Sequence, residues 1–243
     1  MPRLPDHSPD QVVKARQAAS FGAAAELYER ARPGYPDEAV AWLVGPEARD
    51  IVDVGAGTGK LTRQLLASGR RVTAVDHDEG MIAELARRVP EAGALVGRAE
   101  ALPVGDASVD AVVFGQAWHW VDVPEASREV GRVLRSGGVL GLVWNLRDDT
   151  VPWVAELGEV MRGSDAAGMF ARGGPAVDAP FDAVEERVFA WSTTLTPESL
   201  VELAASRSYL LTAERRTGRA SSPACGAWAS GSRAPTARSP CPT

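Results

Sequence analysis

Three glycines in alternate positions, Gly55, Gly57 and Gly59, follow a short apolar run and precede a helical pattern. The run covers residues 50–54 (DIVDV), and its nearly continuous apolarity is typical of a strand that is covered on both faces. Glycines at a strand-to-helix turn allow tight turning, and they let the backbone approach a ligand that a Cβ atom would keep away. The segment therefore predicts a parallel α/β fold with a small-molecule site at this turn.

Short apolar segments alternate with helical patterns along most of the chain, as in βαβ units around a mostly parallel, doubly wound sheet. Strands are predicted over residues 50–54, 71–75, 94–96, 110–114, 139–144 and 186–192. Helices are predicted over residues 18–31, 37–43, 60–67, 80–88 and 124–134, and from Thr196, with Pro197 in its first turn. We expect the N-terminal helices to lie beside the sheet as a lid or a flank.

The spacing around the glycines distinguishes three classes of ligand loop. A phosphate-binding loop needs glycine where Val54 stands and serine or threonine where Leu61 stands, so this class is excluded. A dinucleotide-binding loop needs glycine where Lys60 stands, and an NAD-type oxidoreductase is kept as an alternative. The third pattern, acid-x-Gly-x-Gly-x-Gly with Asp53 as the acid, resembles the cofactor loop of class I S-adenosylmethionine-dependent methyltransferases.

An aspartate at the end of the second predicted strand, Asp76, favours a ligand that contains a nucleoside. It lies 21 residues beyond Gly55. A carboxylate there can accept both hydroxyl hydrogens of a ribose in charge-assisted hydrogen bonds. An isolated aspartate at a strand end is more often a helix cap, so the argument depends on the distance from the glycines.

Residues 21–209 resemble the small-molecule methyltransferases of the trans-aconitate and quinone-biosynthesis type (methyltransferase type 11). The resemblance implies a Rossmann-like methyltransferase fold and an enzyme that uses S-adenosylmethionine as cofactor and a small molecule as acceptor. It implies that Asp53 lies near the ammonium group of the cofactor, that His77 lies beside the ribose, and that Gln116 faces the methionine end. The cofactor-binding residues implied are Asp53, Gly55, Ala56, Gly57, Asp76, His77, Ala99, Glu100 and Gln116.

Two further segments match this family. Residues 97–103 (GRAEALP) resemble the segment that holds the adenine edge, although an arginine replaces the usual aspartate, which leaves the Ala99 backbone and Glu100 as candidates. Tyr28 and Arg32 match an N-terminal element that closes over the cofactor in relatives. Arg32 either pairs with the cofactor carboxylate or caps its helix.

The loop over residues 115–120 (GQAWHW) resembles the segment beside the transferable methyl group in this family. Trp118 and Trp120 are candidates for the wall of an acceptor pocket, but in an extended backbone one of them would face the core. His119 is either a general base, acting as a neutral imidazole near pH 7, or a hydrogen-bonded residue that keeps the loop in shape. Methyl transfer from a sulfonium requires mainly positioning and desolvation, so we expect neither a metal nor a catalytic triad.

The composition of the chain limits the partners and the cellular location that we expect for it. A net charge of −6 lacks the basic excess of a nucleic-acid-binding protein. The apolar runs fall short of the ~18 residues of a membrane span, and the start (MPRLPDHSPDQVV) lacks a signal-peptide core. We therefore expect a cytoplasmic protein that contacts neither membranes nor nucleic acid, and the sequence sets no oligomeric state.

The last 31 residues, 213–243, differ from the rest, because they contain no Val, Ile, Leu, Met, Phe or Tyr. We expect one methyltransferase domain over residues 1–212, with a helical lid over 1–48 and a sheet core over 49–212, followed by a disordered tail. The family resembled ends in a helix and an antiparallel strand, which this tail cannot supply. We therefore expect the final strand to be missing through a shifted reading frame, with a catalytically impaired remnant as a further alternative.

Overall fold

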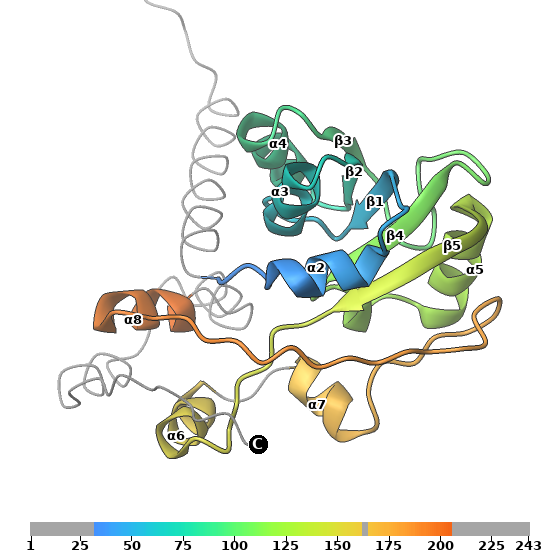
Figure 1. Ribbon diagram of the computed structural model, residues 1–243. Helices are drawn as coiled ribbons and strands as arrows, with labels where there is room; N and C mark the ends of the chain where they lie inside the picture. Colours follow the sequence, from blue (N-terminus) through green and yellow to red (C-terminus); the bar gives the residue numbers. More distant parts are fainter. Residues whose placement is uncertain (1–31, 162–164, 206–243) are drawn as a thin grey trace, which may run out of the picture.

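The computed structural model describes residues 32–161 and 165–205. These residues contain a sheet of five strands in the order β3-β2-β1-β4-β5, and all paired strands run parallel (Figure 1). The strand order reverses between β1 and β4, and open α/β sheets bind ligands beyond the carboxyl ends of the strands at such a point. The strands are β1 (Asp50–Val54), β2 (Arg71–Asp76), β3 (Gly93–Val96), β4 (Val109–Gly115) and β5 (Leu134–Val143).

Helices cover both faces of the sheet, which confirms the predicted doubly wound fold. On one face lie α2 (Asp37–Val44), α3 (Lys60–Ala67) and α4 (Glu79–Arg88), and α5 (Val123–Val133) lies on the other. The remaining helices are α6 (Pro152–Val160), α7 (Asp165–Ala171) and α8 (Pro197–Ala205). No helix within the described ranges is long and apolar enough to span a membrane.

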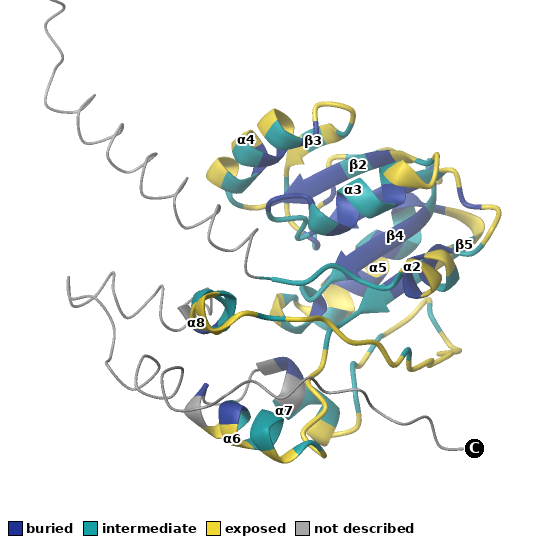
Figure 2. Ribbon diagram, turned by 60° about the vertical axis from the view of Figure 1, so that its left-hand side comes forward, coloured by how far each residue is buried: buried dark blue, intermediate teal, exposed yellow. Residues whose placement is uncertain are grey.

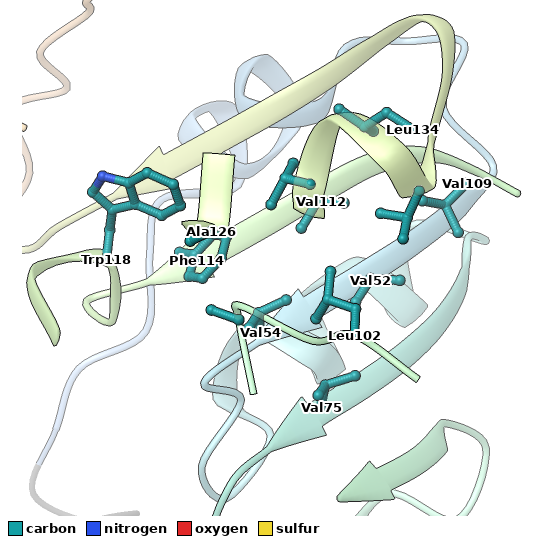
Figure 3. Close-up of a cluster of buried hydrophobic side chains, with 13 residues drawn as sticks. Val52, Val54, Val75, Leu102, Val109, Val112, Phe114, Trp118, Ala126 and Leu134 are labelled. Carbon is teal, nitrogen blue, oxygen red and sulfur yellow. The ribbon is translucent and has the colours of Figure 1, made fainter. Parts of the chain in front are cut away.

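The central strands are buried on both faces because their side chains alternate between two cores. In β1, Ile51 packs with α2 and α3, whereas Val52 packs in the cluster that contains α5. Figure 2 shows the buried residues concentrated in the middle of the sheet. In the α5 cluster, Phe114 and Trp118 meet edge to face with their ring centroids 4.8 Å apart (Figure 3). The nearly continuous apolarity of β1 is therefore explained by burial on both faces.

Most predicted element boundaries agree with the structure to within a residue or two. The α3 helix spans the predicted residues 60–67, and α8 begins at Pro197. The Oγ1 atom of Thr196 accepts the backbone N–H of Ser199 at 3.2 Å, which is the expected N-terminal cap. The α2 helix packs against the sheet through Val40 and Leu43, so this helix is a flank.

The predicted strand over residues 186–192 is wrong, because this segment forms neither strand nor helix. Its apolar and aromatic residues indicated a strand, but a strand also needs a backbone partner, and β5 pairs only with β4 among the described residues. Val188 is 84% exposed. Phe189 packs instead on Trp42 of α2, with ring centroids 6.0 Å apart, and the Arg187 guanidinium lies over the Phe189 ring.

At the amino ends of the strands, one carboxylate joins β1, β4 and β5. One oxygen of Asp110 accepts the backbone N–H groups of Arg49 and Asp50 at 2.8 and 2.9 Å, and the other accepts the Arg135 guanidinium at 2.5 Å. The backbone hydrogen bonds, together with Arg135, lower the pKa of Asp110 to about 2. The ionised carboxylate therefore stabilises this end of the sheet.

Replacing Asp110 with alanine should lower the free energy of unfolding by about 1–3 kcal/mol at pH 7, because two backbone donors lose a charged acceptor. The native pKa lies below the ordinary value of 3.8, so this contribution is complete above about pH 4 and is lost as the pH falls toward 2. Urea unfolding at pH 7, 4 and 2.5 measures both effects. Asp106→Ala is the control, since its side chain is 80% exposed. An equal loss in both variants would contradict the prediction.

Candidate functional site

A pocket lies at the carboxyl ends of β1 and β4, where the strand order reverses. It is formed by the turn before α2, the loop from β1 into α3, and the end of β4. The structure thus brings together five of the predicted cofactor residues and one predicted pocket residue from the N-terminal element. The lining residues are Arg32, Pro33, Tyr35, Asp53, Gly55, Ala56, Gly57, Thr58, Lys60, Leu61, Gly115 and Gln116.

The loop over residues 55–59 requires glycine for two separate reasons. Gly55, Gly57 and Gly59 have φ angles of 67°, 54° and 85°, in the left-handed region that favours glycine. A Cβ atom at Gly55 would also lie 2.5 Å from the Cβ of Ala117 in the loop after β4. At Gly57, by contrast, a Cβ atom would meet nothing within 4 Å. The first glycine therefore allows two loops to approach each other, whereas a Cβ atom on the second, which lines the pocket, would meet open space.

Asp53 lies at the base of this pocket and is almost fully buried. Its Oδ2 atom accepts the hydroxyl hydrogen of Thr62 at 2.6 Å. Burial raises the pKa of Asp53 to about 7, an effect that the Thr62 hydrogen bond opposes and the charge of Asp76 reinforces. A buried carboxylate that titrates near neutral pH is suited to a ligand that brings a positive charge.

Asp76 ends β2 and is tied to the same loop. Its Oδ2 atom accepts the backbone N–H of Gly57 at 2.9 Å, and its Oδ1 atom accepts the backbone N–H of Asp78 at 3.0 Å. The side chain of His77, also predicted at the cofactor, is 81% exposed, and its Nδ1 atom lies 3.3 Å from Oδ1 of Asp76. Neither residue is among the lining residues of the pocket, so their contact with a ribose stays a prediction.

Gln116 lines the pocket in a strained backbone conformation. Its φ angle is 58°, in the left-handed region that residues other than glycine rarely adopt. Its backbone N–H donates to the carbonyl of Val143 at 2.9 Å, so the neighbouring strand holds it in place. Strained residues that the surrounding structure fixes are concentrated at functional sites. Gln116 therefore lies in the pocket lining, and its contact with the methionine end of a cofactor stays a prediction.

The turn over residues 33–36 covers one side of the pocket, and two amides that the sequence analysis missed hold it there. Gln64 of α3 accepts the backbone N–H of Tyr35 at 3.0 Å and donates to its carbonyl at 2.6 Å. Asn145, just after β5, donates to the carbonyl of Gly34 at 2.9 Å. The feature of the sequence that indicated this part of the site was the Pro-Gly-Tyr-Pro turn. Gln64 and Asn145 are too far from the turn along the chain to form a recognisable motif with it. Tyr28, predicted near this turn, lies outside the described residues.

The predicted adenine segment lies apart from the pocket lining. Ala99 is buried in the α5 cluster, and the Glu100 carboxylate accepts the backbone N–H of Asp122 at 3.0 Å, just before α5. Arg132 of α5 donates to the carbonyls of Leu102 and Val104 at 3.2 and 3.1 Å. The segment is therefore fastened to α5, and the predicted contacts of Ala99 and Glu100 with adenine stay untested.

The loop after β4 ends in a single 3₁₀ turn, η1 (Trp118–Trp120). Trp118 is 1% exposed and its indole Nε1–H donates to the carbonyl of Ala176 at 2.7 Å. The expectation that Trp118 lines an acceptor pocket is therefore wrong, because the 3₁₀ turn directs this ring into the core. Trp120 is 65% exposed.

His119 belongs to an aromatic group near the carboxyl ends of β4 and β5. Its Nδ1 atom accepts the indole N–H of Trp144 at 3.4 Å, and its ring centroid lies 4.8 Å from that of Trp120. Trp144 in turn meets Phe170 of α7 edge to face at 5.3 Å. The sequence analysis missed Trp144 and Phe170, which are distant in sequence from the loop. Within the described ranges no group of three or more His, Cys, Asp or Glu side chains could hold a metal ion.

Comparison with known proteins gives a consistent assignment. A profile of the methyltransferase domain family matches residues 52–142. Uncharacterized methyltransferases of Mycobacterium tuberculosis and Mycobacterium bovis are each 50% identical over 193 residues, which span 79% of this chain and 78% of the relative. A solved structure from Anaeromyxobacter dehalogenans that carries the name of a type II methyltransferase is 26% identical, with a TM-score of 0.57, and covers 77% of this chain and 83% of its own. The chain therefore belongs to the class I methyltransferase family.

Proposed function

We propose that this protein transfers a methyl group from S-adenosylmethionine to a small-molecule acceptor. The observation that carries the proposal is the buried Asp53 at the base of a glycine-lined pocket, in a chain of the methyltransferase family. S-adenosylmethionine combines a nucleoside with an amino acid, and its positively charged groups are the kind that a buried carboxylate favours. The reaction class follows from the family, and the fit of the pocket supports the methyl donor.

The residues that line the pocket fit the methionine end of the donor, and Asp76 lies beside the glycine loop. Asp53 would bind the ammonium group, and Arg32 and Gln116 would contact the carboxylate end. Asp76, which is bonded to the backbone of Gly57, would accept the ribose hydroxyls. The open side of Gly57 leaves backbone room that a side chain would fill. When bound, the donor would supply a methyl group on a sulfonium, from which a neutral thioether can leave in an in-line displacement.

The chain itself would contribute mainly orientation and the exclusion of water. The turn at Tyr35, held by Gln64 and Asn145, covers the pocket beside the glycine loop. Such positioning lowers the barrier without a dedicated acid or base. The negative net charge disfavours nucleic acid as the acceptor, which supports a small molecule.

The proposal is tested by comparing ligands and then acceptors. Calorimetric titration should show binding of S-adenosylmethionine and S-adenosylhomocysteine, and no binding of NADH. A panel of small carboxylic acids, phenols and amines, assayed for release of S-adenosylhomocysteine, should then identify the acceptor. Binding of NADH without S-adenosylmethionine would favour the oxidoreductase alternative and refute the proposal.

Replacing Asp76 with alanine should weaken S-adenosylmethionine binding about 10- to 150-fold, because charge-assisted hydrogen bonds of about 1.5–3 kcal/mol are lost. Asp78→Ala is the matched control. Asp78 accepts the N–H groups of Gly80 and Met81 as the N-terminal cap of α4, so its loss should cost about 1 kcal/mol of stability and leave affinity unchanged. Calorimetry gives the affinities and urea unfolding the stabilities. Unchanged affinity in Asp76→Ala would remove this residue from the site.

Affinity for S-adenosylmethionine should rise up to about tenfold per unit between pH 5.5 and 7, because a cationic ligand favours the ionised form of Asp53. The rise should level off above about pH 7, where this carboxyl is already ionised in the free protein. Asp53→Asn, which keeps an acceptor for Thr62, should abolish the dependence. As a ligand control, 5′-methylthioadenosine lacks the ammonium group and should bind equally at each pH. A flat profile for the parent chain would exclude Asp53 as the ammonium partner.

A further inference from the structure

We infer that Trp144 holds His119 in the neutral form that carries its proton on Nε2, so that His119 acts as a hydrogen-bond donor and not as a general base. The link to catalysis rests on the proposed function. The position of the proton on the His119 imidazole is a property of the folded chain, so it can be tested without a measurement of methyl transfer.

The chemistry of the two ring nitrogens determines which ring donates the hydrogen bond and which accepts it. The indole Nε1 of Trp144 lies 3.4 Å from Nδ1 of His119. An indole nitrogen carries a hydrogen and has no acceptor lone pair, so it can only donate. Nδ1 must therefore be unprotonated, and the single proton of a neutral imidazole must be on Nε2. Turning the imidazole ring over would place a carbon against the indole N–H, which would then lose its acceptor.

Both rings are held by their surroundings. Trp144 follows β5 directly, packs against the α5 cluster and meets Phe170 of α7 edge to face at 5.3 Å. His119 lies in η1, whose buried Trp118 is anchored through its indole to Ala176. Because these contacts limit the movement of two half-buried rings, the hydrogen bond selects one ring form.

This form is incompatible with general-base catalysis by His119. Nε2 already carries a proton, and a proton taken up on Nδ1 would face the Trp144 indole N–H, donor against donor. A methyl acceptor that meets Nε2 therefore encounters an N–H group. A methyl acceptor that reached Nε2 would have to accept a hydrogen bond there and could not give a proton to His119.

Long-range ¹H–¹⁵N correlation spectra of the intact chain at neutral pH test the inference directly, because they distinguish the two neutral imidazole forms and the imidazolium. His7 and His77, the other two histidines, are assigned by His→Gln substitution. We expect His119 to show an unprotonated Nδ1 and a protonated Nε2. A proton on Nδ1, in either the other neutral form or the imidazolium, would overturn the inference.

Two tryptophan variants separate positioning by Trp144 from general damage to the fold. Trp144→Phe keeps an aromatic ring but removes the donor, so the His119 signals should shift toward a mixture of the two neutral forms. Trp153→Phe removes a buried indole N–H that has no hydrogen-bond partner among the described residues, and it should leave the His119 signals unchanged. Unchanged His119 signals in Trp144→Phe would show that the indole does not set the form.

Once a methyl acceptor has been identified, steady-state kinetics tests whether His119 acts as a hydrogen-bond donor in catalysis. Glutamine presents an N–H donor at about the position of Nε2, so His119→Gln should keep kcat/KM within about tenfold of the parent, whereas His119→Ala should lose about 10- to 100-fold. Equal losses in the two variants would refute the donor role. If no acceptor is methylated, the proposed function fails, and the spectra still decide the form of His119.

Discussion

The close approach of two loops at Gly55 sets the geometry of the whole site. The loop after β1 and the loop after β4 lie so near that a Cβ atom at Gly55 would stand 2.5 Å from the Cβ of Ala117. The loop after β4 carries both Gln116, which lines the pocket, and His119, so the pocket and the aromatic group lie at the same edge of the sheet. The parallel pairing of β1 with β4 places both loops there, and glycine lets them meet.

Two aspartates, one at each end of the sheet, have carboxyl pKa values that are shifted in opposite directions. At the amino ends, Asp110 is partly exposed and surrounded by donors, which lowers its pKa to about 2. At the carboxyl ends, Asp53 is buried with one hydroxyl donor, which raises its pKa to about 7. The first carboxylate stabilises the fold, whereas the second is costly to ionise unless a cation arrives. This contrast separates the structural end of the sheet from its functional end.

The sequence was sufficient for the features that depend on local pattern. Continuous apolarity located the buried strands, the glycine pattern located the pocket, and the Thr196 cap located the start of α8. It was insufficient wherever the outcome depends on a distant partner. The segment over 186–192 has the composition of a strand but no neighbour to pair with among the described residues. The sequence left open which of Trp118 and Trp120 faces the core, and the structure buries Trp118. The contacts of Gln64 and Trp144 join residues with no shared motif.

The hold of Gln64 on the turn above the pocket has a consequence for how this scaffold changes in evolution. Gln64 binds the backbone N–H and carbonyl of Tyr35, and Asn145 binds the backbone of Gly34, so these contacts with the turn involve none of its side chains. The position of this turn is thus set by two residues that do not line the pocket, together with the packing of the Tyr35 side chain against the cluster that contains α2 and α3. Substitutions at Gln64 or Asn145 can therefore alter the position of the turn, and with it the shape of the pocket, without a change in any residue that lines it.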